Sequence, residues 1–371
     1  MKLHLIGPLP PPLGGATMTF DLFRDEVVAH PDRYGLDRVT LSNISPSFIK
    51  SDHVLPVAAV PAVVGRWVRA VTPAWRADAV VCFVSERWFL SLAPALLLLR
   101  AARKRIVIRF FGNSLVRWLE SLPGALRAAT IWALTRMDAV LLESTTLIED
   151  ARGLGVVNAS QNRNFRPTQG PEFAEWPRRA PSGCRLVFRG LVCRRKGIFE
   201  LLDAIASMPD ADVTCDLWGP IMPGEEQEVL AAIDRTPRCT YCGPTTESPQ
   251  SLLPRYDVFV LPSFHPGEGH SGAVIEAMAV GLPAIVTNHQ GLPELVEDGR
   301  NGRVVAVRSR ESLARAIREL AGDAELRRRM GAEGRRLAAD YDVALNAERI
   351  LESVRVGGWA NGRAQLVRSD S

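Results

Sequence analysis

The sequence predicts an α/β protein with two domains, each organised around a doubly wound parallel sheet. Three observations lead to this fold class. The chain has 371 residues, more than a single hydrophobic core usually organises. Short apolar segments alternate with longer stretches of helical character. A proline-rich segment without periodicity, residues 163–183, lies near the middle of the chain.

Twelve short segments have the composition of strands, six on each side of that division. Most are continuous apolar runs, which is typical of parallel strands covered by helices on both faces. In the first half they are Leu3–Gly7, Arg38–Ser42, Ala79–Ser85, Arg105–Phe111, Ala139–Glu143 and Val156–Ala159. In the second half they are Arg185–Arg189, Val213–Trp218, Thr240–Cys242, Asp257–Pro262, Ala284–Thr287 and Gly302–Val305.

Helical segments lie between these strands. Examples are Leu115–Leu119, Leu126–Thr135, Phe199–Ser207, Glu225–Asp234, Ala273–Val280 and Ser312–Leu320. Strand–helix alternation at this spacing implies right-handed crossover connections, so each half is expected to be a Rossmann-like domain.

The segment 163–183 contains four prolines and predicts a linker. Residues after Val356 are rich in glycine and polar side chains, which predicts a flexible tail. The expected organisation is a first domain at 1–165, a linker at 166–183, a second domain at 184–340, a last helix at 341–356 that packs back on the first domain, and a tail at 357–371.

The formal net charge of +4 is unevenly distributed. Residues 1–180 carry 22 basic against 15 acidic side chains, whereas the remainder carries 23 against 26. A basic first half favours an anionic partner such as a membrane surface. No basic block is dense enough to predict a nucleic-acid-binding stripe, so nucleic acid is not an expected partner.

Six scattered cysteines and a start without a signal-peptide pattern predict a cytoplasmic location. The longest apolar run, Leu90–Leu99, is shorter than the roughly 18–20 residues that span a bilayer and contains Pro94. Cys239 and Cys242 have the spacing of half a zinc site, but no second pair follows. A short strand is the favoured interpretation, and no metal site is expected.

The strongest motif is a glycine-rich loop at 266–271, between a strand that ends at Pro262 and a helix that begins near Gly272. Backbone N–H groups and the helix dipole then point at one place, which suits a diphosphate. Glu276, about one turn into the helix, can accept hydrogen bonds from ribose hydroxyls, and Glu268 can do so from a sugar ring. Either glutamate alone would be an ordinary acid, but the context favours a binding site.

A second motif follows the first strand of the second half. Arg189 and Lys196 flank a strand–turn–helix transition, at the sheet edge where ligands bind in open α/β folds. Two cations there would neutralise a departing nucleoside diphosphate. A basic surface turn is the alternative interpretation.

A third motif, residues 7–17, follows the first strand of the chain. Its prolines stiffen the loop, and Gly14 and Gly15 allow the backbone to approach a ligand closely. It lacks the G-x-G-x-x-G pattern, and by itself it is also compatible with a simple loop.

With these motifs in place, the chain resembles glycosyltransferase family 4, retaining enzymes with the GT-B fold, along nearly its whole length. The resemblance implies two Rossmann-like domains that face a central cleft. It rests on the Pro-Pro-Leu-Gly14-Gly15 loop, the Asn162 segment, the Arg189…Lys196-Gly197 turn, the E-x7-E pair Glu268 and Glu276, the following Gly281-Leu-Pro283, and the stretch Gly291–Gly302.

The resemblance also implies roles for individual residues. The implied catalytic residues are Arg189, Lys196 and Glu268. The implied donor-binding residues are Gly14, Gly15, His270, Ser271, Gly272, Ala273 and Glu276. Arg189 and Lys196 would bind the diphosphate, Glu276 the ribose and Glu268 the transferred sugar, with the base near Tyr241–Pro244. No cofactor is implied and no metal, because the two cations neutralise the leaving group.

One position departs from the family pattern. Many members carry a histidine where this chain has Phe111. Either Arg109 or Asn113 contributes in its place, or the acceptor-side chemistry relies on the substrate. The implied mechanism is donor binding to the second domain, cleft closure with exclusion of water, and attack by the acceptor hydroxyl from the leaving-group side.

The resemblance implies a UDP- or GDP-linked sugar donor and a glycan or polyprenyl-linked acceptor, in the synthesis of bacterial surface polysaccharide. Tryptophans interleaved with arginines support contact with the inner face of an anionic membrane. These tryptophans are Trp67, Trp75, Trp118 and Trp132. The alternative is that the rings belong to the core and the arginines only lie outside it.

Two other functions fit the same architecture. One is a different enzyme, such as a nucleotide-sugar epimerase or a sugar phosphorylase; for the epimerase no acid–base side chains are identified. The other is a binding protein without catalysis, which the phenylalanine at 111 favours. A nicotinamide dehydrogenase is disfavoured, because no G-x-G-x-x-G follows the first strand.

Overall fold

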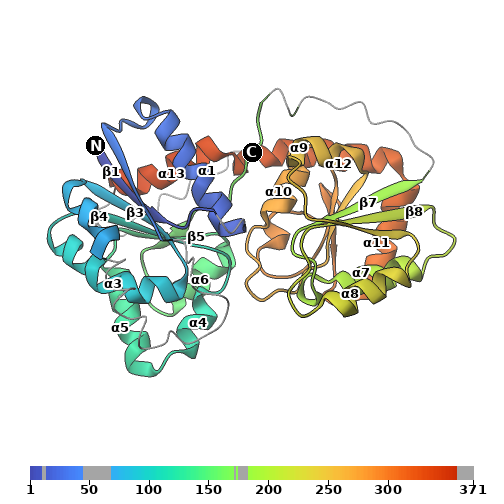
Figure 1. The fold of residues 1–371 in the computed structure, drawn as a ribbon, viewed down its shortest axis with the longest axis horizontal. Helices are drawn as coiled ribbons and strands as arrows, with labels where there is room; N and C mark the ends of the chain where they lie inside the picture. Colours follow the sequence, from blue (N-terminus) through green and yellow to red (C-terminus); the bar gives the residue numbers. More distant parts are fainter. Residues whose placement is uncertain (11–13, 45–67, 171–172, 174–182, 357–371) are drawn as a thin grey trace.

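The computed structural model describes residues 1–10, 14–44, 68–170, 173 and 183–356. Two α/β domains lie side by side (Figure 1). Several sequence predictions concern residues outside the described ranges: most of the linker (171–172 and 174–182), the tail at 357–371, Trp67, and Pro11 to Leu13 of the first loop.

The first domain contains six strands and five described α-helices, followed at the end of the chain by a sixth. The strands are β1 (Lys2–Gly7), β2 (Arg38–Asn43), β3 (Ala79–Val84), β4 (Arg105–Phe110), β5 (Ala139–Leu142) and β6 (Ala159–Gln161). The helices are α1 (Gly15–Ala29), α3 (Glu86–Ala101), α4 (Leu115–Ser121), α5 (Gly124–Thr135), α6 (Thr145–Gly153) and the last one, α13 (Val343–Val356).

The second domain also contains six strands. They are β7 (Cys184–Arg189), β8 (Val213–Trp218), β9 (Cys239–Gly243), β10 (Val258–Leu261), β11 (Ala284–Thr287) and β12 (Gly302–Val305). Its helices are α7 (Ile198–Ala206), α8 (Glu226–Asp234), α9 (Pro249–Leu252), α10 (Gly272–Ala279), α11 (Arg310–Gly322) and α12 (Ala324–Ala338). Short 3-10 turns are η1 (Asp32–Tyr34), η3 (Thr72–Arg76), η5 (Arg194–Lys196), η6 (Leu253–Arg255), η7 (Leu292–Glu294) and η8 (Ala339–Tyr341).

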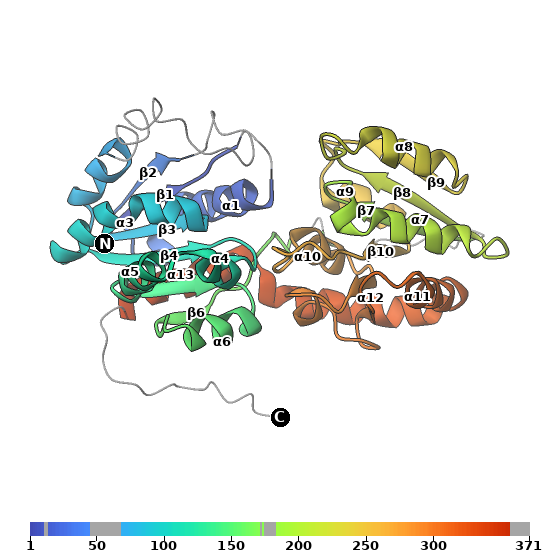
Figure 2. The same ribbon diagram turned by 90° about the horizontal axis from the view of Figure 1, so that it is seen from below.

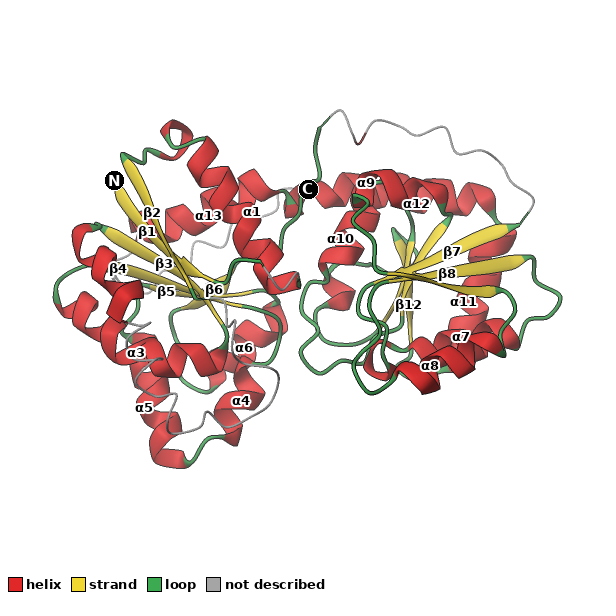
Figure 3. Cartoon of the chain, viewed as in Figure 1, coloured by secondary structure: helices red, strands yellow, loops and turns green. Residues whose placement is uncertain are grey.

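All strand pairs in both sheets are parallel. The strand order is β2-β1-β3-β4-β5-β6 in the first sheet and β12-β11-β10-β7-β8-β9 in the second. Helices cover both faces of each sheet (Figure 3). The strand order therefore changes direction between β1 and β3 and between β7 and β10, which are the switch points where ligands of such sheets bind. The predicted fold class, two doubly wound parallel sheets, is confirmed.

One predicted strand is misplaced. Val156–Ala159 was expected to form a strand, but β6 is Ala159–Gln161, which pairs with β5 from Val140 opposite Ala159 to Leu142 opposite Gln161. Val156 is fully buried in the turn after α6, where Ala159 N–H donates to the Val156 carbonyl at 3.1 Å. Its apolar side chain thus reflects packing in a turn and not strand pairing.

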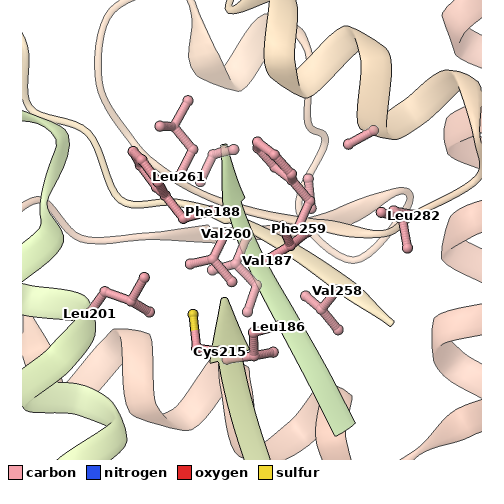
Figure 4. Close-up of a cluster of buried hydrophobic side chains, with 14 of the residues drawn as sticks. Leu186, Val187, Phe188, Leu201, Cys215, Val258, Phe259, Val260, Leu261 and Leu282 are labelled. Atoms are coloured by element: carbon pink, nitrogen blue, oxygen red, sulfur yellow. The ribbon is translucent and has the colours of Figure 1, made fainter. Parts of the chain in front are cut away.

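Apolar side chains from both faces of the sheets build the cores. In the second domain Leu186, Phe188 and Phe259 are fully buried between the strands and the surrounding helices (Figure 4). Complete burial of one such side chain contributes roughly 1.5–3 kcal/mol. The first sheet separates two clusters, one of which includes Leu92 and Leu96 of α3 and the other Phe20 and Phe23 of α1.

The last helix, α13, lies against the first domain and not against the second (Figures 1 and 2). It packs on α1, β4 and β5 and buries Ile350, Leu351 and Val354 in their core. Arg105 Nη1 donates to the Val354 carbonyl at 2.9 Å and to the Arg355 carbonyl at 2.6 Å. The chain thus passes between the domains twice, once before β7 and once before α13.

Cys239 and Cys242 lie on strand β9, the interpretation that the sequence favoured. In the described ranges, no three His, Cys, Asp or Glu side chains gather as a metal site would require. No described helix combines the length and the apolar character needed to traverse a bilayer.

Candidate functional site

The carboxyl ends of strands from both sheets surround one cleft of about 910 Å³ between the domains. This volume lies in the range of roughly 300–1,000 Å³ that is common for small-molecule sites. The cleft is lined by all ten site residues that the sequence indicated: Gly14, Gly15, Arg189, Lys196, Glu268, His270, Ser271, Gly272, Ala273 and Glu276.

The second domain presents its part of the site at its switch point. Arg189 is the last residue of β7, and Lys196 ends the η5 turn that follows. The loop after the neighbouring strand, β10, carries Glu268 and leads to the N-terminus of α10 at Gly272. Two neighbouring parallel strands thus deliver cations, carboxylates and a helix N-terminus to the same edge of the sheet.

Glu276 connects two arginines. Its Oε2 accepts a hydrogen bond from Arg189 Nη1 at 2.5 Å, and its Oε1 accepts one from Arg166 Nε at 3.1 Å. Glu276 and Arg166 are both buried, and Arg166 also donates to Thr19 Oγ1 at 3.0 Å. Arg166 therefore links the second domain's carboxylate to α1 of the first domain.

Arg166 also lies directly over the start of α10. A Cβ atom at Gly272 would stand 2.1 Å from Arg166 Nη2, so a larger residue there would have to displace the guanidinium. A guanidinium at a helix N-terminus interacts unfavourably with the positive end of the helix dipole. It also adds positive potential at the place where an anion would bind. The cleft thus contains three cations, Arg166, Arg189 and Lys196, in its described lining.

Lys196 and Glu268 form the second ion pair. Lys196 Nζ donates to both carboxylate oxygens of Glu268, at 2.9 Å and 2.7 Å, and the Ser263 hydroxyl donates to the same carboxylate. The Lys196 side chain is 21% exposed, so it remains accessible from the cleft. An anionic ligand that binds Lys196 therefore competes with Glu268 for the ammonium group.

His270 has a different place from the other loop residues. Its backbone N–H donates to Glu143 Oε2 at 3.0 Å, and its carbonyl accepts from Asn164 Nδ2 at 2.7 Å. Its ring is fully buried, with Nε2 3.1 Å from Glu294 Oε2. The backbone of His270 therefore faces the first domain, while the ring holds the loop to Glu294.

Sequence reasoning predicted Gly14 and Gly15 of the first domain but missed the charged and polar side chains that follow strands β5 and β6. Arg166, Glu143 and Asn164 line the cleft, although none was proposed for it. Glu143 comes directly after the apolar strand β5, a signal similar to that of Arg189, which is the last residue of β7. Asn164 and Arg166 alternate with apolar Phe165 before a proline, a pattern that places both polar side chains on one side of an extended segment.

Neither residue proposed to replace the family histidine lines the cleft. Phe111 does line it, and Arg109 lies behind, fully buried, with its guanidinium 5.8 Å from the Phe111 ring centroid. Burial lowers the pKa of Arg109 to about 10, and the carboxylate of Glu143 opposes that shift. Asn113 instead donates to Gln290 Oε1 at 3.3 Å and accepts from Ser144 Oγ at 3.0 Å.

Of the segment Tyr241–Pro244, near which the nucleotide base was expected, Pro244 lines the cleft. Residues 244–249 line the cleft together with Trp218. Tyr241 packs against the hydrophobic core, and its hydroxyl donates to the Gly219 carbonyl at 3.0 Å.

Comparison with known proteins finds a family match in the second domain. Residues 183–323 match the model of the family described as glycosyl transferases group 1. The fold is that of a two-domain GT-B protein, and residues 183–323 of its second domain are similar to the glycosyl transferases of group 1.

The chain is similar to several curated glycosyltransferases. One is the lipopolysaccharide core biosynthesis glycosyltransferase LpsE of Rhizobium meliloti, 30% identical over 149 residues, which are 39% of this chain and 42% of LpsE. Another is the glycogen synthase of Mycobacterium tuberculosis, 30% identical over 241 residues, 61% of this chain and 56% of that enzyme. The chain thus spans about half the length of these relatives, or less.

Solved structures resemble the whole chain. HepE from Anabaena in complex with UDP has a TM-score of 0.72 and 18% identity, over 96% of this chain and 100% of HepE. Sucrose-phosphate synthase from Thermosynechococcus elongatus has a TM-score of 0.72 and 17% identity, over 95% of this chain and 98% of that chain. At this level of identity the likeness establishes the GT-B fold.

Proposed function

We propose that this protein is a retaining glycosyltransferase that moves a sugar from a UDP- or GDP-linked donor to a hydroxyl of a glycan or polyprenyl-linked acceptor. The proposed setting is the synthesis of bacterial surface polysaccharide. The observation that carries the proposal is that Arg189, Lys196, Glu268 and Glu276 share one cleft at the switch point of the second sheet. The match of residues 183–323 to the glycosyl transferase family supports it.

The contacts of the cleft suggest how the donor binds. The diphosphate takes the place between Lys196, Arg189 and the N-terminus of α10, where positive charge and free N–H groups converge. Glu276 turns to the ribose hydroxyls and Glu268 to the transferred sugar, each of which releases a cation for the phosphates. Fixed cations then stabilise the departing diphosphate, and this chemistry needs no metal ion.

The acceptor approaches from the first domain. Its hydroxyl oxygen forms the new bond to the sugar on the face from which the diphosphate departs, and its proton passes to the departing phosphate oxygen, so the configuration is retained. Trp75 and Trp132 are about half exposed, and Arg136 lies 4.9 Å from the Trp132 ring centroid. These exposed rings support contact with an anionic membrane at the cytoplasmic face, where a lipid-linked acceptor would lie.

A thermal-shift screen over UDP- and GDP-linked sugars tests the donor site. A donor at 100 times its dissociation constant stabilises the protein by roughly 2.7 kcal/mol. We expect Lys196→Ala and Glu276→Ala each to abolish this shift while the protein stays folded. Arg194→Ala is the matched control, because Arg194 is an exposed cation two residues away that pairs with Glu228 outside the cleft.

Shifts that persist unchanged in both variants would move the donor site elsewhere. Turnover with acceptor, presented free and in anionic vesicles, then separates the alternatives. A binding protein binds the donor without turnover, and an epimerase converts it without any acceptor.

A further inference from the structure

One carboxylate of the first domain stands in the cleft without a role in the mechanism above. Glu143 follows β5 directly, is 4% exposed and is the only carboxylate that the first domain contributes to the described cleft lining. Its Oε1 accepts from Gly112 N–H at 3.2 Å, and its Oε2 accepts from His270 N–H at 3.0 Å. Backbone donors from both domains thus fix its orientation.

A buried arginine lies beside Glu143. Arg109 Nη2 lies 3.5 Å from Glu143 Oε1, and the Arg109 side chain is completely buried. Its Nε donates to Asn162 Oδ1, but Nη1 and Nη2 have no hydrogen-bond partner in the described part of the chain. A buried guanidinium needs a neighbouring negative charge, and the carboxylate of Glu143 is the acidic group beside Arg109. An ionised carboxylate only accepts hydrogen bonds, so a ligand must offer it a hydroxyl or an N–H group.

The position of Glu143 assigns it to the sugar rather than to the nucleotide. A Cβ atom at Gly269 would lie 2.1 Å from Glu143 Oε2, so the carboxylate lies against the loop beside Glu268. That is the part of the loop to which the proposed function assigns the transferred sugar. A nucleotide base would suit another part of the second domain, formed by the loop 244–249 and Trp218. In the described structure, these residues make no hydrogen bond with Glu143.

The neighbouring polar side chains of the first domain are already engaged with one another. Thr19 donates to Asn164 Oδ1 at 2.9 Å, and Arg166 donates to Thr19 and to Glu276. Phe111 offers no hydrogen-bonding group. Among the side chains on this side of the cleft, Glu143 is therefore the one that can accept a hydrogen bond beside the loop 266–271, where the transferred sugar is proposed to bind.

We propose that Glu143 is a sugar-recognition residue whose carboxylate accepts a hydrogen bond from a ring hydroxyl of the donor sugar. Arg109 is its positioning residue and does not touch the ligand. The inference rests on the proposed function. It adds a residue of the first domain that recognises the sugar, while the second domain binds the nucleoside diphosphate.

The test compares two ligands on the same protein. Isothermal titration gives dissociation constants for the free nucleoside diphosphate and for the nucleotide sugar identified by the screen. Glu143→Asp keeps a negative charge near Arg109 but withdraws the carboxylate by one methylene group. Glu143→Gln keeps the reach and removes the charge. We expect both variants to bind the nucleotide sugar on the order of ten-fold more weakly, and the nucleoside diphosphate as the wild type does.

Glu149→Gln is the matched control, since Glu149 is an exposed glutamate on the next helix, and it should leave both constants unchanged. Equal weakening of both ligands would show that Glu143 acts on the arrangement of the domains, and unchanged constants would show that it does not contact the sugar. Either result overturns this inference alone. A wild-type protein that binds neither ligand would overturn the proposed function and this inference with it.

Discussion

Arg189 and Lys196 are positioned by partners that a substrate can replace. Each is bound to a cleft carboxylate, Arg189 to Glu276 and Lys196 to Glu268. Removal of one partner from a buried pair is costly because it leaves an uncompensated charge. A ligand that carries both phosphates and hydroxyls avoids that cost, since it supplies a new partner to every member of both pairs. This exchange favours a nucleotide sugar over a simple anion.

At the same scale, His4 predicts a pH dependence of stability. His4 is fully buried in β1, with Nδ1 2.8 Å from Thr40 Oγ1 and Nε2 3.0 Å from the Ala70 carbonyl. Burial lowers the pKa of His4 below its usual value of 6.5. The unfolded chain therefore binds this proton more readily, so the stabilising contribution is present above about pH 6.5 and is lost as the pH falls through the lowered pKa.

We expect the melting temperature to be lower at pH 5.5 than at pH 7.5, and the difference to be smaller in His4→Gln. Burial, with Lys196 nearby, lowers the pKa of His265 as well, so part of the difference should remain. Thermal unfolding of both proteins at both pH values measures this. An identical decrease in the two proteins would contradict the assignment to His4.

At the scale of the element, α13 shows how a helix distant in sequence completes a core. Val354 and Val356 lie on the same helix, but Val354 is fully buried and Val356 is 81% exposed. Val354→Ala should lower the free energy of unfolding by about 2 kcal/mol, because it removes buried methyl groups and leaves a cavity. Val356→Ala should change it by less than about 0.5 kcal/mol. Denaturant titration of both variants gives the comparison, and similar losses in both would mean that α13 is not part of the core.

At the scale of the whole molecule, the loop after β10 and the η7 turn after β11 are held against the first domain. Thr145 N–H donates to Glu294 Oε1 at 2.8 Å, Arg117 Nη2 to the Pro266 carbonyl at 2.5 Å and Asn113 N–H to the Gly267 carbonyl at 3.4 Å. The proposed donor loop therefore depends on both domains for its conformation.

Gly112 permits this contact. It has a φ of +65°, and a Cβ atom there would lie 2.6 Å from the Gly267 carbonyl oxygen of the second domain. Gly35 has a φ of +59° in the same domain, but a Cβ atom there would meet nothing within 4 Å. Both alanine variants share a backbone strain of roughly 1–2 kcal/mol. Only Gly112→Ala should also displace the loop, and its kcat/KM should fall about ten-fold or more.

Melting temperature and kcat/KM for the two variants separate these effects. Comparable melting temperatures with a selective loss of kcat/KM in Gly112→Ala are expected. Equal activity in both variants would mean that the close approach of the domains does not matter for turnover.

The sequence by itself determined the fold class, nearly all strand positions and the second domain's share of the cleft. These features are local: an apolar run of four to six residues, a turn and a helix start lie next to one another in the chain, and their order fixes which side chains reach the edge of the sheet.

Only the tertiary structure decided which charges meet. Lys196 and Glu268 are 72 residues apart, Arg189 and Glu276 are 87 apart, and Arg166 and Glu276 are 110 apart. Strand order and the contact between the domains also bury Arg109 behind Phe111 and place Glu143 against the loop 266–271. These ion pairs and hydrogen bonds depend on how the two sheets face each other. The local spacing of residues in the sequence does not predict that arrangement.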